Sequence, residues 1–471
     1  MRTEHDALGS RQIEDKYYYG IQTQRALENF SISGTTIADI PSYIDSLLQI
    51  KKAAAIANHR VAALGDEQLS AIVLAADEFI HSHKVVQFPL DIYQGGGGTS
   101  TNMNVNEVLA NRANEILTGK KGYESVHPNT HINMCQSTND VIPSAMKITA
   151  HRMLGDLEKA LLRFAADLGH KQVEFADVVK LGRTCLQDAL PLTLGQQFSG
   201  YRSAFERSAR HVAEVRSHCL ELPMGGTAIG TEFGTFPGYK EAFYQALSKN
   251  TGINFQPEPN FFDGLQNADF WISVSAALKT TASLLNKLAS DLRLMGSGPR
   301  SGLAEVKLPA VQPGSSIMPG KVNPVIPEMA IQVYFRVLGN DLSITRACEG
   351  ELELNVWESL ILNCFSESSR LLIECLPLFS EKCLGKLIAN QESCAQSAES
   401  SLALSTVIAT LFDYKTASDV AKKAEQDGKS IHQVVVESGL LSLEQASELL
   451  DPKVLTSPEL FHGLYRGKLH V

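Results

Sequence analysis

The sequence predicts a mainly α-helical protein built from more than one domain, and three observations support that fold class. Apolar residues recur at helical spacing through long segments of residues 141–395. Strand-like alternation of apolar and polar residues is almost absent from the same region. The chain has 471 residues, about three times the length of a typical single domain, so one compact core is not expected.

Residues 1–140 are expected to form an N-terminal domain that mixes turns with helices. A helix is predicted to begin at Pro41, because proline suits a first helical turn and the apolar cluster 53–57 follows it. Two further helices are predicted in this domain, over residues 67–79 and 105–117. A glycine-rich loop is predicted between them, at residues 94–102.

Residues 141–395 are expected to form a central domain of long helices. In the clearest of them, Leu278, Leu285 and Leu292 lie seven residues apart on one apolar stripe that ends at residue 295. Similar helices are predicted over residues 145–168, 194–220, 328–344 and 356–376. At about 1.5 Å per residue, helices of this length form a bundle roughly 30–45 Å long.

Residues 396–471 are expected to form a small C-terminal helical domain. Two short helices are predicted, over residues 430–437 and 442–450. Gly439 is typical of a helix end, and Ser442 is typical of a helix start.

Composition excludes several classes of function. Hydrophobic residues make up 44% of the chain and charged residues 20%, as in a soluble globular protein. With 42 Lys+Arg against 52 Asp+Glu, the net charge is −10, and no basic block is present. Nucleic acid and an anionic membrane surface are therefore not expected as partners. We expect no membrane span and no signal peptide, because no run of 18 apolar residues occurs and residues 1–10 are polar.

The positions of the cysteines bear on the redox state of the thiols and on metal binding. All eight are dispersed, without Cys-x-x-Cys pairs or short His/Cys clusters. This spacing suits neither a disulfide framework nor zinc or iron–sulfur ligation. We therefore expect reduced thiols in a cytoplasmic protein, and no bound metal.

Four polar islands interrupt the helical pattern, and function is expected there. The first, residues 95–106, contains Thr99 after a glycine run that permits close backbone approach to a ligand; a plain glycine-rich turn is the alternative. It lacks the pattern of a nucleotide P-loop. The second, residues 135–140, holds Ser137, Thr138 and Asn139, which suit either a helix cap or the binding of a carboxylate.

The other two islands lie in the central domain. In residues 181–188, Arg183 and Asp188 could pair structurally, while Thr184 and Cys185 are candidates for facing a ligand. Residues 314–324 read Gly-Ser-Ser-Ile-Met-Pro-Gly-Lys-Val-Asn-Pro. Paired serines and a lysine between glycine and proline indicate a loop that closes over a site, or a solvated connection between helices.

The segment 314–324 resembles the signature loop of the aspartase/fumarase superfamily. The resemblance continues through Gly-Ile-Gln-Thr-Gln-Arg at residues 20–25, the glycine-rich island, Gln-Ser-Thr-Asn-Asp at 136–140 and Gly-Arg-Thr-x-Leu-Gln-Asp at 182–188. It implies a three-domain, mainly α subunit whose long central helices form the twenty-helix core of a homotetramer. It also implies active sites that three subunits share.

Most distinguishing segments resemble the aspartate ammonia-lyase branch of that superfamily. These segments are residues 87–96, 324–328, 339–341 and 352–356, whereas residues 22–25 and 127–129 are more similar to class II fumarases. The resemblance therefore implies reversible elimination of ammonia from L-aspartate, which gives fumarate. A class II fumarate hydratase, a lyase acting on a substituted amino diacid and a non-catalytic descendant are the alternatives.

The resemblance also implies roles for individual residues. Ser315 is the expected general base, assisted by Lys321. The residues expected to bind the small dicarboxylate substrate are Thr99, Ser137, Thr138, Asn139, Thr184, Cys185, Lys321 and Asn323. Among these, Lys321 and Asn323 are expected at the α-carboxylate, and Thr184 and Asn139 near the amino group. Neither a metal nor an organic cofactor is expected.

The sequence departs from the superfamily pattern at three places. Cys185 stands where fumarases have histidine and aspartases have histidine or glutamine, so the groups around the leaving amine differ. Thr130 replaces an aspartate in the His-Pro-Asn-Asp run, which puts a second carboxylate site there in doubt. Residues 409–414 replace an Asn-Pro-x-Ile-Gly-type run, so the C-terminal domain is expected to differ in its loops or regulation.

Overall fold

A computed structural model describes residues 1–82 and 84–468 of the chain. The chain folds into two compact units, each assembled from separated stretches. The first unit contains Met1–Lys159, Arg210–Thr280 and Phe335–Ile373. The second contains Ala160–Ala209, Thr281–Tyr334 and the C-terminal stretch from Glu374. The predicted domain boundaries near residues 140 and 395 stay predictions.

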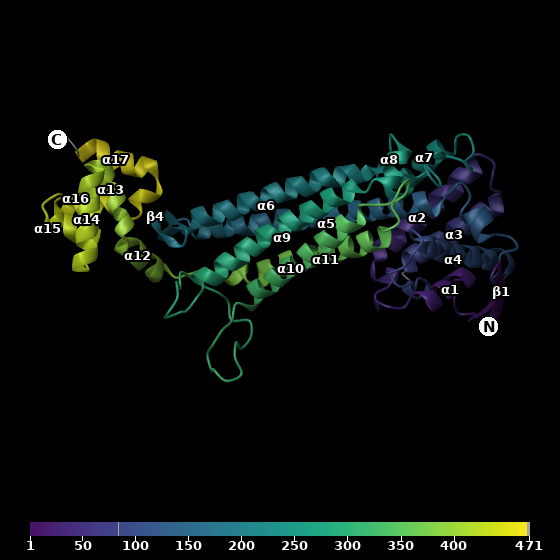
Figure 1. Cartoon of the computed structure of the whole chain (residues 1–471), viewed down its shortest axis with the longest axis horizontal. Coiled ribbons are helices and arrows are strands. Elements are labelled where there is room, and N and C mark those ends of the chain that lie inside the picture. Colours follow the sequence, from purple (N-terminus) through teal and green to yellow (C-terminus); the bar gives the residue numbers. More distant parts are fainter. Residues whose placement is uncertain (83, 469–471) are drawn as a thin grey trace. The chain divides into compact units, whose positions relative to one another are not determined.

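Long helices dominate the chain, which confirms the mainly α fold class (Figure 1). Each of the five longest contributes one segment to each unit: α5 Thr138–Glu174, α6 Leu194–Ser217, α9 Asp269–Met295, α10 Val325–Ala347 and α11 Glu358–Lys382. All five were predicted from apolar periodicity. Two of them, α5 and α9, begin well before the predicted starts. Helix α5 opens with the polar residues Thr138, Asn139 and Asp140, which hide the helical period.

In the first unit, helix α2, Pro41–Arg60, lies next to α3, α4 and α7 (Figure 1). Besides α2, this unit contains the following shorter elements: β1 Arg2–Asp6, β2 Gly9–Ile13, α1 Ile21–Asn29, α3 Asp66–Ser82, α4 Thr99–Thr118, β5 Glu221–Leu222, α7 Tyr239–Thr251, β6 Gln256–Pro257 and α8 Phe261–Gln266. Helix α2 packs against α3 and α7, and α4 packs against α1 and α3. Leu47, Leu48 and Ile50 of α2 are fully buried in this core, so the predicted helix at Pro41 and its inward apolar face are confirmed.

Helix α4 corrects one prediction. Residues 94–102 were predicted to be a loop, yet α4 begins at Thr99, directly after Gly98 in the left-handed conformation. The side-chain oxygen of Gln94 fixes this start by accepting hydrogen bonds from the backbone N–H and the hydroxyl of Thr101, at 3.1 and 2.9 Å. The helical period was hidden because Asn102 and Asn104 are polar and nevertheless buried.

The second unit combines short antiparallel strand pairs with small helices. Its elements besides the long helices are β3 Val179–Thr184, β4 Gln187–Thr193, β7 Val306–Lys307, β8 Ile388–Ala389, α12 Gln391–Ser400, α13 Ser405–Leu411, α14 Tyr414–Asp427, α15 Ile431–Glu437, α16 Leu443–Leu449 and α17 Pro458–Lys468. The β3–β4 pair is antiparallel. The third polar island, predicted to be loop-like, is therefore a hairpin, and its polar tip concealed the strand alternation.

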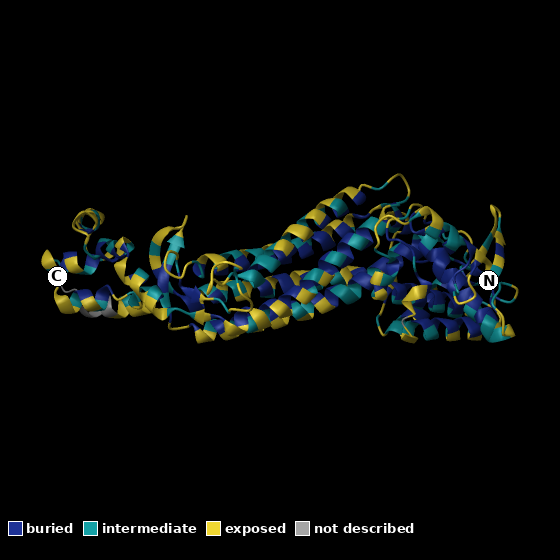
Figure 2. Ribbon diagram, turned by 90° about the horizontal axis from the view of Figure 1, so that it is seen from below, coloured by how far each residue is buried: buried dark blue, intermediate teal, exposed yellow. Residues whose placement is uncertain are grey.

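The C-terminal helices share a small core of their own. Ile408, Val420, Val434 and Leu449 are among its buried residues, and Figure 2 shows buried and exposed residues alternating along these helices. Ser430 and Ser442 each form a capping box, with α15 and α16 respectively. Both short helices were predicted, and the structure confirms them; of the two capping residues, only Ser442 was predicted as a helix start.

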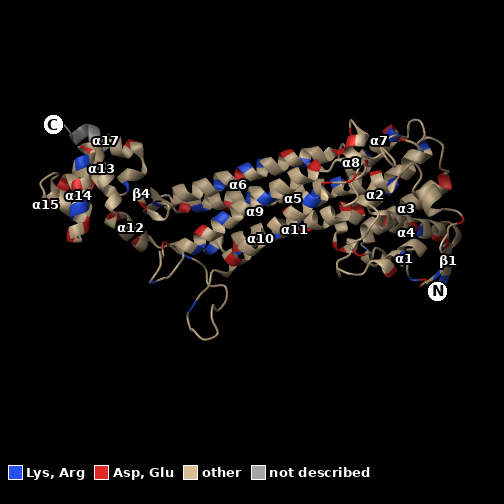
Figure 3. Ribbon diagram, viewed as in Figure 1, with Lys and Arg blue, Asp and Glu red and all other residues tan. Residues whose placement is uncertain are grey.

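Within the described residues, no helix combines the length and the apolar character that a membrane crossing requires. Lysine and arginine alternate with aspartate and glutamate along the long helices rather than gathering by sign (Figure 3).

A buried carboxylate joins the N-terminal elements of the first unit. Glu107 of α4 is 1% exposed and accepts hydrogen bonds from the backbone N–H groups of Gly20, Gln22 and Thr23 at 2.8, 2.8 and 3.1 Å. The Thr23 hydroxyl donates a fourth, at 2.7 Å. Helix α1 has no capping side chain of its own, so Glu107 satisfies its free N–H groups from another helix.

We predict that Glu107→Gln destabilises the protein by about 2–4 kcal/mol, because the amide removes the charge and offers one acceptor oxygen in place of two. Urea unfolding followed by circular dichroism measures this loss. Glu124→Gln, at an exposed position of the same unit, is the control and should change stability by less than about 0.5 kcal/mol. Equal stabilities of the two variants would contradict the capping role.

Candidate functional site

The residues expected at the site fall into two sets, one in each compact unit. Thr99, Ser137, Thr138 and Asn139 belong to the first unit, and Thr184, Cys185, Ser315, Lys321 and Asn323 belong to the second. Within each unit these residues lie in loops and turns, at the end of strand β3 or at helix starts.

The glycine-rich island forms a tight turn into α4. Gly96, Gly97 and Gly98 all have positive φ, at 78°, 58° and 82°, where an L side chain is strained. A Cβ atom on Gly98 would also lie 2.8 Å from Ile142 of α5. The start of α4 therefore approaches the first turns of α5 so closely that only glycine fits at the contact.

The second island caps helix α5. Ser137 directly precedes the helix, and its hydroxyl accepts a hydrogen bond from the backbone N–H of Asn139 at 3.2 Å. The buried carboxylate of Asp140 accepts from the N–H groups of Ser137, Gly225 and Thr227 at 2.9, 3.1 and 3.0 Å. Of the two roles considered for this island, capping is therefore confirmed, and Asp140 additionally ties the island to the loop at residues 225–227.

A buried polar network joins the starts of α4 and α5. The side-chain oxygen of Asn133 accepts hydrogen bonds from Lys51 Nζ, Asn102 Nδ2 and Asn106 Nδ2, at 3.0, 3.1 and 3.2 Å. Asn102 Nδ2 also lies 3.1 Å from Thr138 Oγ1. This hydrogen bond fixes the position of a side chain expected to bind substrate.

The sequence analysis missed Lys51, although one signal was available. A lysine next to the alanine-rich run of α2 is unusual in a buried helix face. Lys51 is fully buried and also donates to Gln136 Oε1 at 2.9 Å. Burial lowers the pKa of Lys51 to about 7 and raises the pKa of Asp140 to about 7, since desolvation disfavours both charges.

The starts of α4 and α5 form a region of the first unit that is suited to binding an anion. The N-termini of α4 and α5 carry the positive ends of two helix dipoles, and hydroxyl and amide side chains stand at both. A carboxylate placed there would meet donors without needing a surface cation.

The β3–β4 hairpin presents the third island at its tip. Thr184 pairs with Gln187 across the turn, and Cys185 and Leu186 occupy the turn with φ of 53° and 60°. Such a turn normally selects asparagine or glycine, so these two residues hold a strained conformation. The Cys185 thiol and the Leu186 side chain are exposed, available to a ligand beyond the hairpin.

A buried ion triad anchors this hairpin. The carboxylate of Glu305 is fully buried and pairs with Lys180 at 2.8 Å and Arg183 at 2.6 Å. The predicted structural partner of Arg183 was Asp188. That prediction is wrong: Asp188 is its register partner across the hairpin, but the guanidinium turns to Glu305. The pairing of Arg183 with Glu305 could not be read from the local sequence, because Glu305 lies 122 residues further along the chain.

The fourth island is the long loop between β7 and α10, as predicted. The backbone N–H of Gly314 donates to the carbonyl of Lys321 at 2.9 Å, and Asn323 Nδ2 donates to the carbonyl of Gly314 at 2.7 Å. A Cβ atom on Gly314 would lie 2.6 Å from that Lys321 oxygen. Glycine is therefore required where the loop closes.

Ser315 sits inside this closed loop. Its Oγ accepts hydrogen bonds from the backbone N–H groups of Ile317 and Met318, at 3.2 and 3.1 Å. Ser315 and Lys321 line the same hollow, whose volume is about 420 Å³. Donors aimed at a hydroxyl oxygen stabilise its deprotonated form.

Comparisons with known proteins agree with this architecture. The family described as "Lyase" matches residues 9–339, and the family described as "Fumarase C C-terminus" matches residues 404–457. An aspartate ammonia-lyase from Helicobacter pylori is 42% identical over 463 residues, 98% of this chain and 99% of that protein. A class II fumarate hydratase from Halobacterium salinarum is 44% identical over 464 residues, 98% of each protein.

Solved structures give the same result. A fumarate lyase:delta crystallin from Brucella melitensis, crystallised with bound cobalt, has a TM-score of 0.95 and 43% identity. The match covers 97% of this chain and all of that one.

The chain belongs to the aspartase/fumarase superfamily of lyases. Within it, the chain is similar over nearly its whole length to aspartate ammonia-lyases, and it is an enzyme of the carbon–nitrogen lyase type.

We predict that Lys51 makes stability depend on pH between about 7 and 10. In this range the unfolded chain binds more protons, because the pKa of Lys51 falls from 10.5 to about 7 on folding, so the free energy of unfolding rises with pH. In Lys51→Met a rise on the order of 4 kcal/mol should disappear, as measured by urea unfolding at several pH values. Lys52→Met, which removes the neighbouring lysine paired with Asp77, should keep the rise, and an unchanged slope in Lys51→Met would contradict the prediction.

We predict that Glu305→Gln destabilises the protein by about 3–5 kcal/mol, because it leaves two largely buried cations without a counter-charge. Thermal unfolding of this variant, compared with wild type, measures the loss. Glu392→Gln, at an exposed position of the same unit, is the matched control. A wild-type melting temperature in Glu305→Gln would show that the triad does not anchor the hairpin.

Proposed function

We propose that this protein catalyses the reversible elimination of ammonia from L-aspartate to give fumarate. The observation that carries the proposal is the pair of backbone N–H groups directed at Ser315 Oγ. The resemblance of most distinguishing segments to the aspartate ammonia-lyase branch supports the same substrate, as does the Helicobacter pylori relative.

The chemical difficulty of this reaction is the removal of a weakly acidic proton from carbon. The proton leaves the carbon next to the β-carboxylate and is taken up by Ser315 Oγ. The carbon–nitrogen bond then breaks, its electron pair leaves with the nitrogen, and the remaining electrons form the double bond of fumarate. Charge accumulates on the β-carboxylate before the amine departs, so donors around that carboxylate lower the barrier.

Ser315 must act as an oxyanion, because a neutral hydroxyl is too weak a base. The N–H groups of Ile317 and Met318 would stabilise the alkoxide, and Lys321 would supply a positive charge from the same loop. These three groups together account for a basic serine without a metal or an organic cofactor.

The remaining residues would hold the substrate. Thr99, Ser137, Thr138 and Asn139, at the starts of α4 and α5, would surround the β-carboxylate as it gains charge. Lys321 and Asn323 would hold the α-carboxylate. Thr184 and Cys185, at the hairpin tip, would lie near the amino group together with Asn139. Amines leave more readily than hydroxide, so a thiol at position 185 is better tolerated in ammonia elimination than in hydration.

We further propose a homotetramer in which three subunits contribute to each active site. Large apolar side chains remain exposed on the long helices, among them Leu162, Leu294 and Leu342. Exposed apolar residues of this size support an extended interface between subunits. All eight cysteines are free, which supports a reducing, cytoplasmic location.

Class II fumarate hydratase activity is the second candidate, favoured by the Halobacterium salinarum relative. A substituted amino diacid is the third candidate substrate, because Cys185 is smaller than the histidine or glutamine of aspartases. Both candidates would use the same base and the same carboxylate-binding residues. The leaving group alone separates them from aspartate.

We predict that purified protein releases fumarate from L-aspartate and that Ser315→Ala lowers this rate by at least about 100-fold, with the assembly unchanged by size-exclusion chromatography. Ultraviolet absorbance of fumarate measures the rate. Ser316→Ala is the matched control, since this adjacent hydroxyl is exposed and should be dispensable. Unchanged turnover in Ser315→Ala would overturn the assignment of the base, and turnover of L-malate or an N-substituted aspartate without L-aspartate would overturn the substrate.

A further inference from the structure

The hydroxyl of Thr138 accepts a hydrogen bond on one side and has a free proton on the other. Its Oγ1 atom accepts from Asn102 Nδ2 at 3.1 Å. In the part of the chain that the structure describes, the Thr138 hydroxyl donates no hydrogen bond. The residue is partly exposed at the first position of α5, so this proton is available to an acceptor on a ligand.

The amide of Asn133 sets the direction of the hydrogen bond to Thr138. Asn133 Nδ2 donates to the backbone carbonyl of Gln136 at 3.2 Å, and a carbonyl can only accept. Asn133 Oδ1 is therefore the atom that faces Lys51 Nζ and Asn102 Nδ2, at 3.0 and 3.1 Å. Because this oxygen stands in front of Asn102, the Asn102 amide must present its nitrogen there, and the same nitrogen has a second proton for Thr138.

Asn102 keeps this orientation although its own oxygen stays unpaired. The residue is 1% exposed, and among the described residues its Oδ1 atom has no hydrogen-bond partner. An unsatisfied buried acceptor is destabilising. The two protons of Nδ2 go to Asn133 and Thr138, so this amide contributes through its donors and not through its acceptor.

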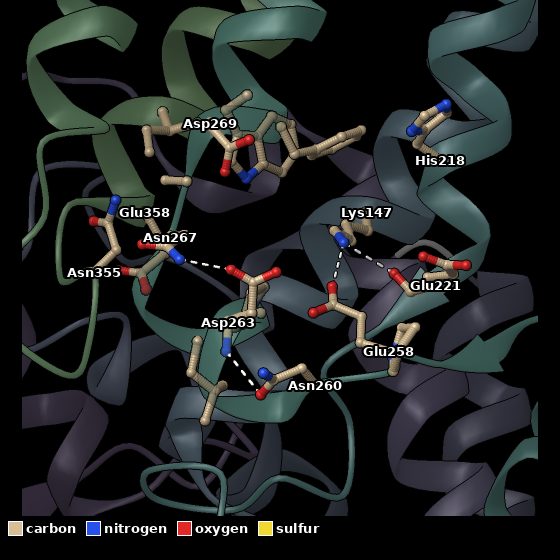
Figure 4. A pocket seen from close by; sticks show the side chains of 18 residues that line it. Lys147, His218, Glu221, Glu258, Asn260, Asp263, Asn267, Asp269, Asn355 and Glu358 are labelled. Carbon is tan, nitrogen blue, oxygen red and sulfur yellow. Dashed lines mark hydrogen bonds and ion pairs between the residues drawn. The ribbon is translucent and has the colours of Figure 1, made fainter.

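Other contacts hold the backbone of α5. Asp140, in the first turn, ties the helix to residues 225–227 by accepting from two backbone N–H groups. Further along the helix, Lys147 forms an ion pair with Glu258 and donates to the carbonyl of Glu221 at 3.0 Å (Figure 4). With the helix held in this way, the remaining freedom at its first residue is the direction of the hydroxyl proton.

We propose that Asn102 is a positioning residue for the reaction, an inference that rests on the proposed function. The Asn102 amide directs the Thr138 hydroxyl proton toward the substrate carboxylate that gains charge when the carbon loses its proton. A hydroxyl whose oxygen already accepts from an amide donates more strongly. The carboxylate carries its greatest charge before the amine departs, so this donor stabilises the transition state more than the bound substrate.

Steady-state kinetics with L-aspartate tests the role of Asn102. Asn102→Leu has a similar volume and removes both donors, so we expect kcat to fall about 10–100-fold while KM changes by less than about 3-fold. Asn104→Leu is the matched control, because Asn104 is also buried in α4, donates to the Gln87 carbonyl at 2.9 Å and has an unpaired Oδ1. The control should lose comparable stability in urea unfolding and keep the wild-type kcat. Equal losses of kcat in the two variants would overturn the proposal.

A double-mutant cycle separates positioning of one hydroxyl from a general loosening of the site. Thr138→Val removes the hydroxyl, keeps the shape of the side chain and should lower kcat about 10–100-fold. In this background Asn102→Leu should lower kcat by less than about 3-fold more, because the group that it directs is gone. Additive losses, or an unchanged kcat in Thr138→Val, would overturn the proposal. Asn102→Ser, with a smaller polar side chain, takes the place of Asn102→Leu if the latter does not fold.

Binding of 3-nitropropionate separates this role from the choice of substrate. Its nitronate form places two negatively charged oxygens where the β-carboxylate gains charge, and it has no leaving group. By calorimetry of the full-chain protein, Asn102→Leu should weaken nitronate binding by at least about 10-fold and succinate binding by less than about 3-fold. Nitronate binding that depends on Asn102 in a protein inactive on L-aspartate would overturn the substrate and support the positioning role. Absence of nitronate binding, or equal binding by wild type and Asn102→Leu, would overturn the positioning role even where L-aspartate is turned over.

Discussion

The hydrogen bonds that converge on Asn133 are the constraint on which the first unit depends. Three donors from α2 and α4 share one amide oxygen, and the same donors reach Gln136 and Thr138. An unsatisfied buried polar group costs about 1–3 kcal/mol, so a network of this kind is tolerated only when its members meet in one arrangement. The starts of α4 and α5 are therefore fixed together, and the residues proposed to bind a carboxylate are fixed with them.

Backbone geometry enforces the same arrangement. The contact of Gly98 with Ile142 leaves no space for a side chain, while the contact of Gly314 with the Lys321 carbonyl does the same in the signature loop. Gly98 lets the first turn of α4 lie against α5. Gly314 lets the signature loop close, and within that loop backbone N–H groups donate to Ser315 Oγ. Because such groups are neutral and rigid, they stabilise an anion without long, mobile cationic side chains. A net charge of −10 is therefore compatible with the proposed dicarboxylate substrate, which local donors would hold.

The sequence predicts the helices well and their polar partners poorly, for a physical reason. Apolar periodicity is a local property, so the five long helices were predicted, although α5 and α9 begin seven and nine residues before their predicted starts. The helix start at Ser442 was predicted for the same local reason. The island motifs also supplied the candidate site residues, whose roles stay predictions. Lys51, Glu305 and Glu358 were missed because burial and pairing depend on residues far away in the chain, such as Asn133 for Lys51 and Arg183 for Glu305. The hairpin at residues 179–193 was missed because its turn has neither glycine nor asparagine.

The buried carboxylates described here are stabilised by the fold in different ways. Glu107 has four hydrogen-bond donors, Asp140 has three backbone donors, and Glu305 has two cations. Each of these charges is compensated by the fold itself. The Oε2 atom of Glu358 has no hydrogen-bond partner among the described residues, and a Cβ atom on Gly97 of the glycine-rich turn would lie 3.8 Å from it. Glu358 stands in the first turn of α11, where the positive end of the helix dipole favours a carboxylate, so the helix itself offsets part of a charge that no side chain compensates.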